Sequence, residues 1–177
     1  MADGDEEALT TDLASFAEGD FWSFSLAIYA RPGVRPACLR LQDELGLDVN
    51  MVLFCLWAGS RGRRLEQDRL AAIAAEAKLW QHHAVAPLRQ LRRWLKAEAA
   101  QGDGKVAQLR RAIKEQELRA EAIEQTRLSR QLPDGQGASD AAAAAQDNFK
   151  TYLRLENVAL TDDINDIFSN MLKYIVE

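Results

Sequence analysis

The segment 49–58 constrains the fold of this chain most strongly, because nine of its ten residues are apolar and only Asn50 is polar. Asp48 precedes the segment and is a favoured helix N-cap residue, so we predict a helix over 49–58 that Gly59 ends. A helix with apolar side chains in every direction is stable only when other elements surround it. We therefore expect this helix at the centre of a helical bundle.

The rest of the chain predicts further helices and shows no strand pattern and no internal repeat. The 177 residues include only 4 Pro and 10 Gly, and Ala is abundant, which favours helix throughout. The predicted helices cover residues 21–29 (with Asp20 as N-cap), 34–45, 66–84, 87–100, 105–131, 139–156 and 164–175, and Pro87 is expected to break the chain between the third and fourth of these. The prediction is an all-α, single-domain helical bundle of about seven to eight helices. The long helices 105–131 and 139–156 are expected to form an antiparallel hairpin.

Three regions follow from charge and hydropathy. Residues 1–17 are acidic and rich in small residues, which predicts a flexible tail. Residues 18–158 form the predicted bundle, and residues 159–177 form an amphipathic helix that docks on the bundle or on a partner. The apolar face of that helix comprises Ile164, Ile167, Phe168, Met171, Leu172 and Ile175.

Composition points to a cytoplasmic protein without a cofactor. The N-terminus carries no apolar segment typical of a signal peptide, and the longest apolar run, 51–58, is far below the roughly 20 residues that span a membrane. Cys38 and Cys55 lie in apolar helical patterns without ligand spacing, so we predict buried free thiols in a reducing compartment. No GxSxG, Walker A, GxGxxG or HExxH motif is present, which argues against an enzyme and predicts no metal site.

Residues 20–59, which read DFWSFSLAIYARPGVRPACLRLQDELGLDVNMVLFCLWAG, resemble a proteobacterial family of domains of unknown function, number 2390. The resemblance continues through residues 86–96 and 114–121 and more weakly near 148–153. It implies a small bacterial cytosolic helical protein and brings no activity, cofactor or functional residue. The acidic tail and the final helix look like additions to the family pattern.

A basic helix face is the first candidate binding surface. Spacings of i, i+3, i+4 and i+7 place four cations within one face, without an acid at i±4 to pair with them. A basic loop precedes this helix and could lie nearby. The candidate residues are Arg61, Arg63 and Arg64 in the loop and Arg89, Arg92, Arg93 and Lys96 on the helix, with Leu88, Leu91 and Leu95 on the core side. Three interpretations stay open: a solvated face covered by the acidic tail, a site for an acidic protein, and a site for RNA or another phosphate ligand.

Two further motifs have both a chemical and a structural interpretation. Asp162, Asp163 and Asp166 match the DDxxD pattern that holds magnesium diphosphate, but they also open a helix, where acids favour the macrodipole. His82 and His83 are adjacent and point about 100° apart on a helix, so we interpret them as helix-end residues rather than metal ligands.

Four residues of the aromatic core define a candidate pocket: Trp22, Tyr29, Asn50 and Trp57. Aromatic residues at helical spacing more often form plain core than a ligand site. Asn50 is expected to bond backbone groups in the first turn of its helix.

The sequence favours a non-enzymatic cytosolic adaptor, a bundle with a protruding helical hairpin that binds another macromolecule through the basic face. An acidic protein surface is the expected partner, with RNA less favoured and self-association through the last helix as a further route. The alternative is a protein or enzyme that binds an anionic small molecule such as a diphosphate.

Overall fold

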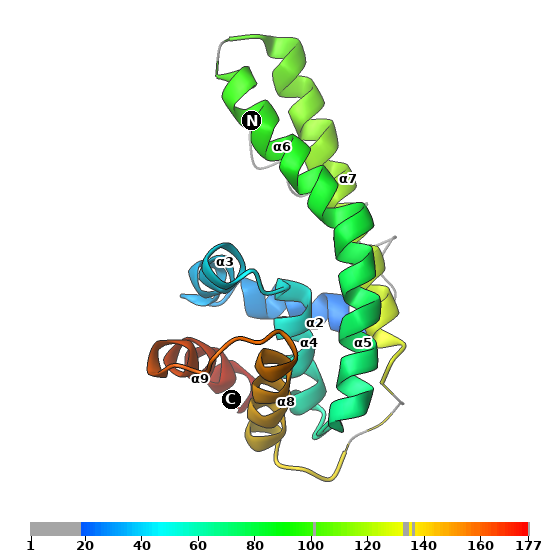
Figure 1. Cartoon of the computed structure of the whole chain (residues 1–177), viewed down its shortest axis with the longest axis vertical. Helices are drawn as coiled ribbons and strands as arrows, with labels where there is room; N and C mark the ends of the chain where they lie inside the picture. The colour runs from blue at the N-terminus through cyan, green and yellow to red at the C-terminus, as the bar shows by residue number, and fades with distance from the viewer. Residues whose placement is uncertain (1–18, 101, 133–134, 136, 177) are drawn as a thin grey trace.

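The computed structural model describes residues 19–100, 102–132, 135 and 137–176, so the predicted acidic tail 1–17 lies outside the described residues. Within these ranges the chain forms helices and no strand, which confirms the all-α prediction (Figure 1). The helices are α2 (Asp20–Tyr29), α3 (Val34–Leu45), α4 (Val49–Ser60), α5 (Gln67–Trp80), a π-helical segment (Gln81–Val85), α6 (Ala86–Ala99), α7 (Gly104–Ser129), α8 (Ala141–Leu155) and α9 (Asp162–Val176). If α5 and α6 are counted as one continuous helix, the described residues form seven helices, and otherwise eight.

Helix α4 occupies the centre of the bundle, as its apolar sequence predicts. Every residue from Asn50 to Gly59 is buried, and α2, α3, α7, α8 and α9 all contact the helix. Asp48 caps it by accepting a hydrogen bond from the backbone N–H of Asn50. Gly59 does not end the helix, contrary to the prediction. The helix continues to Ser60, and Gly59 instead lies against Ala145 of α8, where a side chain would not fit.

The predicted break at Pro87 is wrong. Helices α5 and α6 form one continuous rod, joined by the π-helical segment that precedes the proline (Figure 1). Proline in a regular helix clashes with the carbonyl of the residue four positions earlier, which here is His83 inside the π segment. The wider i→i+5 pattern moves that carbonyl away from the ring, so the helix bends around Pro87 and continues.

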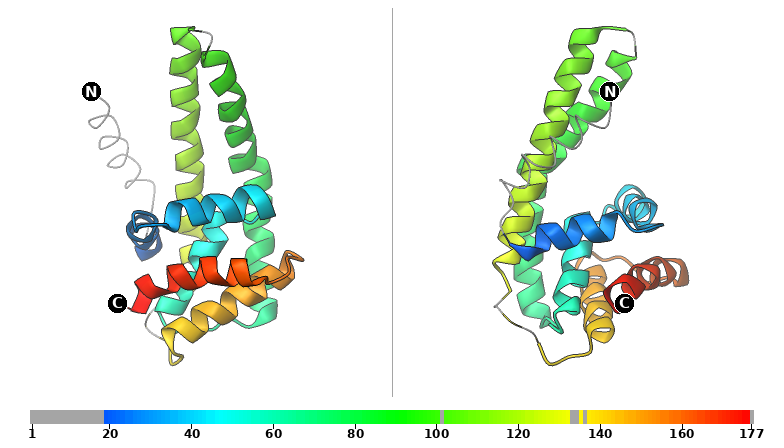
Figure 2. Two further views of the ribbon diagram at one scale, coloured as in Figure 1. Left: turned by 90° about the vertical axis from the view of Figure 1, so that its left-hand side faces the viewer. Right: turned by 180° about the vertical axis from the view of Figure 1, so that it is seen from behind.

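The hairpin also has a different partner from the one predicted. Helix α7 runs antiparallel along α6, and α8 packs along α4 instead. The far ends of α6 and α7 extend well beyond the other helices (Figures 1 and 2). The wrong pairing arose because α7 and α8 are neighbours in sequence, whereas the small residues Gly59 and Ala145 draw α8 onto the central helix.

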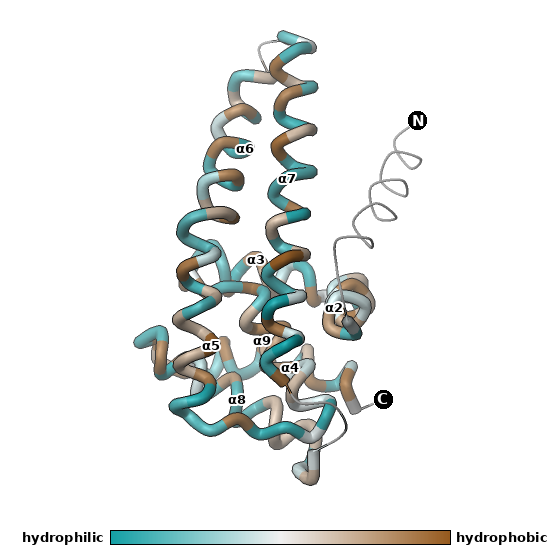
Figure 3. Tube along the Cα trace, turned by 90° about the vertical axis from the view of Figure 1, so that its right-hand side faces the viewer, coloured by the Kyte–Doolittle hydropathy of each residue, from teal (hydrophilic) through white to brown (hydrophobic). Residues whose placement is uncertain are grey.

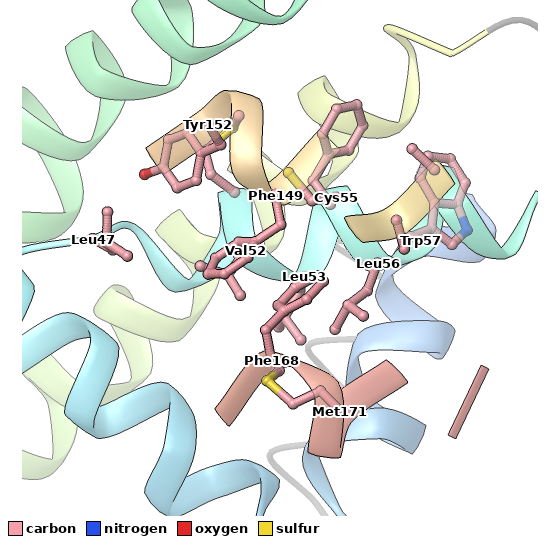
Figure 4. Close-up of a cluster of buried hydrophobic side chains, with 14 of the residues drawn as sticks. Leu47, Val52, Leu53, Cys55, Leu56, Trp57, Phe149, Tyr152, Phe168 and Met171 are labelled. Atoms are coloured by element: carbon pink, nitrogen blue, oxygen red, sulfur yellow. The ribbon is translucent and has the colours of Figure 1, made fainter. Parts of the chain in front are cut away.

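Helix α9 docks on α3, α4 and α8 of its own chain. Its apolar face is covered: Phe168 stacks on Phe149 of α8 with ring centroids 3.9 Å apart, and Met171 is buried beside it (Figure 4). At the start of the helix, Asp163 pairs with Arg40 of α3 at 2.8 Å. The amphipathic face predicted from the sequence is therefore part of the bundle core.

Candidate functional site

Two helices that project from the bundle form the most distinctive feature of the structure. We call α6 together with residues 104–117 of α7 the hairpin arm. Leu95 is buried between the two helices, and Val106 and Ile113 are half-buried on the facing side. Apolar positions recur along both helices up to the far end of the arm (Figure 3). The arm is therefore a two-helix unit with a narrow apolar seam of its own.

A cluster of ion pairs fixes the root of the arm. Arg89 donates from Nε to Glu117 at 3.0 Å and from Nη2 to Glu121 at 2.7 Å. Arg92 donates to both oxygens of Glu117. Burial alone would raise the pKa of Glu117, but the bonds from Arg92 and Arg89 outweigh it and hold this pKa below its ordinary value.

The basic helix face is therefore paired within the chain, which corrects the idea of an unpaired stripe. Arg89 and Arg92 bind α7, and Arg93 binds Asp43 of α3 at 2.8 Å. Only Lys96 of the four cations forms no ion pair with a described residue. Spacing within one helix could not indicate these partners because they come from other helices.

The basic loop does not join this face. Arg61 pairs with Asp20 at 3.2 Å, and Arg64 pairs with Asp147 of α8. The backbone carbonyl of Arg63 accepts a hydrogen bond from Asn148 at 2.8 Å. These contacts hold the loop on α2 and α8 rather than forming one anion site with the arm.

Charge reversal should separate the buried pairs from the exposed one. We expect Arg92→Glu to lower the free energy of unfolding by about 2–3 kcal/mol, because it places a carboxylate beside the nearly buried Glu117. Arg93→Glu should cost less than about 1 kcal/mol, because both side chains of its pair are half exposed. Urea denaturation of the two variants tests this, and equal losses would contradict it.

A buried polar cluster lies where the arm joins the bundle. Asn50 donates a hydrogen bond to Glu124 at 2.9 Å and accepts one from Gln125 at 2.7 Å. It therefore bonds side chains of α7, and the prediction that it bonds backbone groups of its own turn is wrong. Gln81 of the π segment donates to Glu124 at 2.8 Å and to Asp48 at 3.1 Å. The only sequence signal for this cluster was the single polar residue in an apolar helix.

Asp48 and Glu124 form a pair of neighbouring buried carboxyl groups. Asp48 Oδ2 and Glu124 Oε1 are buried and accept no hydrogen bond from the described donors. Burial raises the pKa of Glu124 well above its ordinary value, and the nearby Asp48 raises it further. Burial also raises the pKa of Asp48. We predict that the two groups share one proton, which would supply the donor that these two oxygens lack.

The four residues of the candidate pocket lie in different surroundings. Trp57 packs in the aromatic core against Phe21, with ring centroids 5.1 Å apart, and Trp22 packs on Ala122 of α7. Tyr29 is half-buried at the edge of the core, and Asn50 belongs to the polar cluster. Their contacts are those of core residues rather than of one ligand pocket.

A groove of about 510 Å³ runs between α3, the α5–α6 rod and α8. Two ion pairs lie along it: Arg93 with Asp43, and Lys78 with Glu156 at 2.9 Å. The groove is also lined by the apolar residues Leu47 and Met51 and by the polar residues Asp48, Gln81 and Tyr152. His82 lines it as well and contacts His83. The groove is thus lined by charges of both signs.

The aspartates of the DDxxD motif lie in the first turns of α9, away from this groove, and Asp163 is engaged by Arg40. Among the described residues, no group of three or more His, Cys, Asp or Glu side chains is arranged to hold a metal ion. None of the described helices combines the length and the apolar character that a membrane span needs.

The outer part of the arm exposes three large apolar side chains. Leu91 is 39% exposed, Trp94 59% and Leu109 49%, whereas Leu91 had been expected to face the core. The prediction for Leu91 is wrong because this residue lies beside the seam rather than in it. Leu91 precedes the seam residue Leu95 by four positions, just as Leu109 precedes the seam residue Ile113 by four.

These three residues share one face of the arm. Two antiparallel helices are related by an approximate two-fold axis perpendicular to the plane that contains both of them. Residues that stand the same number of positions before a seam residue, one on each helix, therefore lie on the same face of the pair. Leu91 stands four positions before Leu95, and Leu109 stands four positions before Ile113, so the two leucines lie on the same face. Trp94 is about one helical turn from Leu91 and lies on that face as well. Trp94 and Leu109 are each five residues from the adjoining helix ends, Ala99 and Gly104, so they lie at about the same level. We call Leu91, Trp94 and Leu109 the apolar patch.

The chain is thus an all-α protein in which a paired-helix arm with an apolar patch stands on a polar root. Residues 20–128 match the family described as "Protein of unknown function (DUF2390)", and the chain belongs to this family. No curated protein and no solved structure matches the chain. The matched segment includes the whole arm and its root, and it ends before α8 and α9.

Proposed function

We propose that this protein is a non-enzymatic cytoplasmic adaptor that binds another macromolecule through the free end of its hairpin arm. The apolar patch carries the proposal. Single exposed apolar residues are common, but three on one face of a projecting element are typical of an interaction surface. Trp94 is the most exposed of the three, and tryptophan is enriched among the residues that dominate binding energies.

The construction of the arm supports this proposal. The ion pairs from Arg89 and Arg92 to α7 fix its root, and the α5–α6 rod is continuous through the π segment. A surface held in place before binding loses less conformational entropy on association than a flexible one. A rigid arm that extends beyond the bundle can reach a partner without rearrangement (Figure 2).

The cysteines support the cytoplasmic location. Cys38 and Cys55 are both free and buried in the core. Free thiols persist in a reducing compartment, and secreted proteins of this size more often pair their cysteines.

Replacing Trp94 should remove the partner without affecting the fold. We expect Trp94→Asp to weaken binding at least about tenfold, because a charge then occupies the centre of the apolar patch. The measurement is quantitative mass spectrometry of proteins that co-purify with each variant from cells in which the protein is native. Leu79→Asp is the matched control, since Leu79 is 63% exposed on α5, outside the arm. Equal partner recovery with both variants would refute a role for the arm.

The groove favours a second candidate, binding of a small anion. Arg93, Lys78 and His82 line it, and the two exposed ion pairs of Arg93 and Lys78 are weak enough for a ligand anion to replace the carboxylates. Pyrophosphate, with and without Mg²⁺, should then raise the melting temperature, and Arg93→Ala should abolish the rise. A rise that needs Mg²⁺ and is lost in Asp162→Ala would instead assign the ligand to the start of α9. No rise would exclude a pyrophosphate site.

A further inference from the structure

We infer that the groove between α3, the α5–α6 rod and α8 binds a short peptide with free ends, about five residues long. The carboxylate of this peptide binds Arg93, and its ammonium group binds Glu156. The inference rests on the second candidate function, a small-ligand site in the groove, and names the class of ligand. It does not depend on the apolar patch of the arm.

The charges that line the groove match a ligand that carries both signs. The groove volume of about 510 Å³ lies within the range of roughly 300–1,000 Å³ that is typical of ligand sites. A ligand with only negative charge, such as pyrophosphate, is repelled by the carboxyl groups as well as attracted by the cations. A ligand with one charge of each sign finds a partner for both. The described lining residues include three carboxyl side chains and three cationic ones, namely Asp43, Asp48 and Glu156, and Lys78, Arg89 and Arg93.

The end of the groove at Arg93 favours the carboxylate of the ligand. Arg93 pairs with Asp43 at 2.8 Å, and both side chains are half exposed, so this ion pair can be exchanged. Arg89 also lines the groove, one helical turn before Arg93. A guanidinium group can donate two parallel hydrogen bonds to one carboxylate. Two cations beside one carboxyl group therefore leave room for a second carboxylate.

The end at Glu156 favours the ammonium group. Lys78 pairs with Glu156 at 2.9 Å, but the lysine side chain is 70% exposed and the glutamate side chain only 21%. Lys78 can therefore turn into the solvent, whereas Glu156 stays at the groove. The ammonium group of a ligand can then take the place of the lysine as the partner of Glu156.

The distance between the two ends sets the length of the peptide. Lys78 and Arg93 are fifteen residues apart on the continuous α5–α6 rod, which corresponds to roughly 20 Å along the axis. An extended chain rises about 3.3 Å per residue, so five residues span about 17 Å. A single amino acid is too short to reach both ends.

Between the two ends, the groove has unused hydrogen-bonding groups of both kinds. The hydroxyl of Tyr152 accepts a hydrogen bond from the backbone N–H of Asp48 at 3.1 Å, but its own proton has no acceptor among the described residues. Gln81 donates through Nε2 to Asp48 and Glu124, and its Oε1 accepts from no described donor. A peptide backbone supplies both an acceptor and a donor at each amide, which suits these two side chains.

Isothermal titration of the full chain with pentaalanine tests the inference. We expect the peptide with free ends to bind, and its N-acetylated and C-amidated forms to bind at least about tenfold more weakly. Arg93→Ala and Glu156→Gln should each weaken binding by about the same factor. Lys78→Ala should bind at least as tightly as the wild type, because Glu156 is then free for the ammonium group. Arg64→Ala is the matched control, since it removes an exposed ion pair, with Asp147, outside the groove.

Titration of the same variants with pyrophosphate separates the two ways in which the inference can fail. Pyrophosphate binding that both Lys78→Ala and Arg93→Ala abolish, without binding of pentaalanine, would overturn the inference and leave the groove as an anion site. Pentaalanine binding that does not need the free ammonium group, that Arg93→Ala leaves intact, or that Lys78→Ala weakens would also overturn it. No binding of either ligand would overturn the second candidate function as well.

Discussion

Gly59→Val should destabilise the bundle by about 4 kcal/mol or more. Gly59 lies inside the central helix α4, and a Cβ atom there would come within 3.0 Å of three atoms of Ala145, two of them backbone. Overpacking usually costs 1–3 kcal/mol when flexible side chains can yield, and here α8 as a whole must move away. Because α8 carries Phe149, which supports Phe168 of α9, the separation would loosen both helices.

Thermal and urea unfolding measure the loss. For a chain of this size, about 4 kcal/mol corresponds to a fall in melting temperature of roughly 8–16 °C. Gly104→Ala is the control: Gly104 begins α7, and an added Cβ would meet nothing within 4 Å. That variant should be neutral or slightly stabilising, since Ala favours helix over Gly. A Gly59→Val protein as stable as the wild type would show that α4 and α8 are not packed this closely.

The central helix and the terminal helix were predictable because their patterns are local. A helix with apolar residues all round has to be buried, and Ile164, Phe168 and Met171 share one face by spacing alone. The stop at Gly59 failed because glycine serves two purposes, ending helices and permitting close packing. Only knowledge of the neighbouring Ala145 distinguishes them.

The arm was less predictable because its features depend on which helices meet. The partners of Arg89 and Arg92 are 25 or more residues away on α7, so the spacing within one helix suggested free cations. The exposure of Leu91 has the same origin: the sequence indicates an apolar stripe, but the stripe is wider than the seam of a two-helix hairpin. The remainder of the stripe stays exposed and forms part of the apolar patch.

The pH dependence of stability should reveal the carboxyl pair at the root of the arm. Folded Glu124 has a pKa raised by burial and by Asp48, so it holds a proton that the unfolded chain releases near its ordinary pKa. A raised carboxyl pKa stabilises the fold fully at low pH, and this contribution is lost as the pH rises toward the folded pKa. The free energy of unfolding should therefore fall from pH 5 upward, by at most about 1.4 kcal/mol for each pH unit.

Glu124→Gln should flatten this dependence, because the amide can donate to Asp48 at every pH and still accept from Asn50 and Gln81. The other titratable groups around Asp48 and Glu124 determine the pH dependence that remains in this variant. Glu121 also has a pKa raised by burial, so it retains a smaller slope. The guanidinium of Arg89 partly offsets the effect of burial on the pKa of Glu121 and of Asp48. Tyr152 stays uncharged between pH 5 and pH 8, since burial raises its pKa further above neutrality.

Urea unfolding of the wild type and Glu124→Gln at pH 5, 6, 7 and 8 provides the test, with Glu156→Gln as the control. Glu156→Gln is the same carboxyl-to-amide change in the surface ion pair of Glu156 with Lys78, and this variant should keep the wild-type slope. An unchanged slope in Glu124→Gln would mean that the two carboxyl groups share no proton. The loss of the slope would show that the junction of arm and bundle is held by a proton, so that the base of the arm weakens as the pH rises.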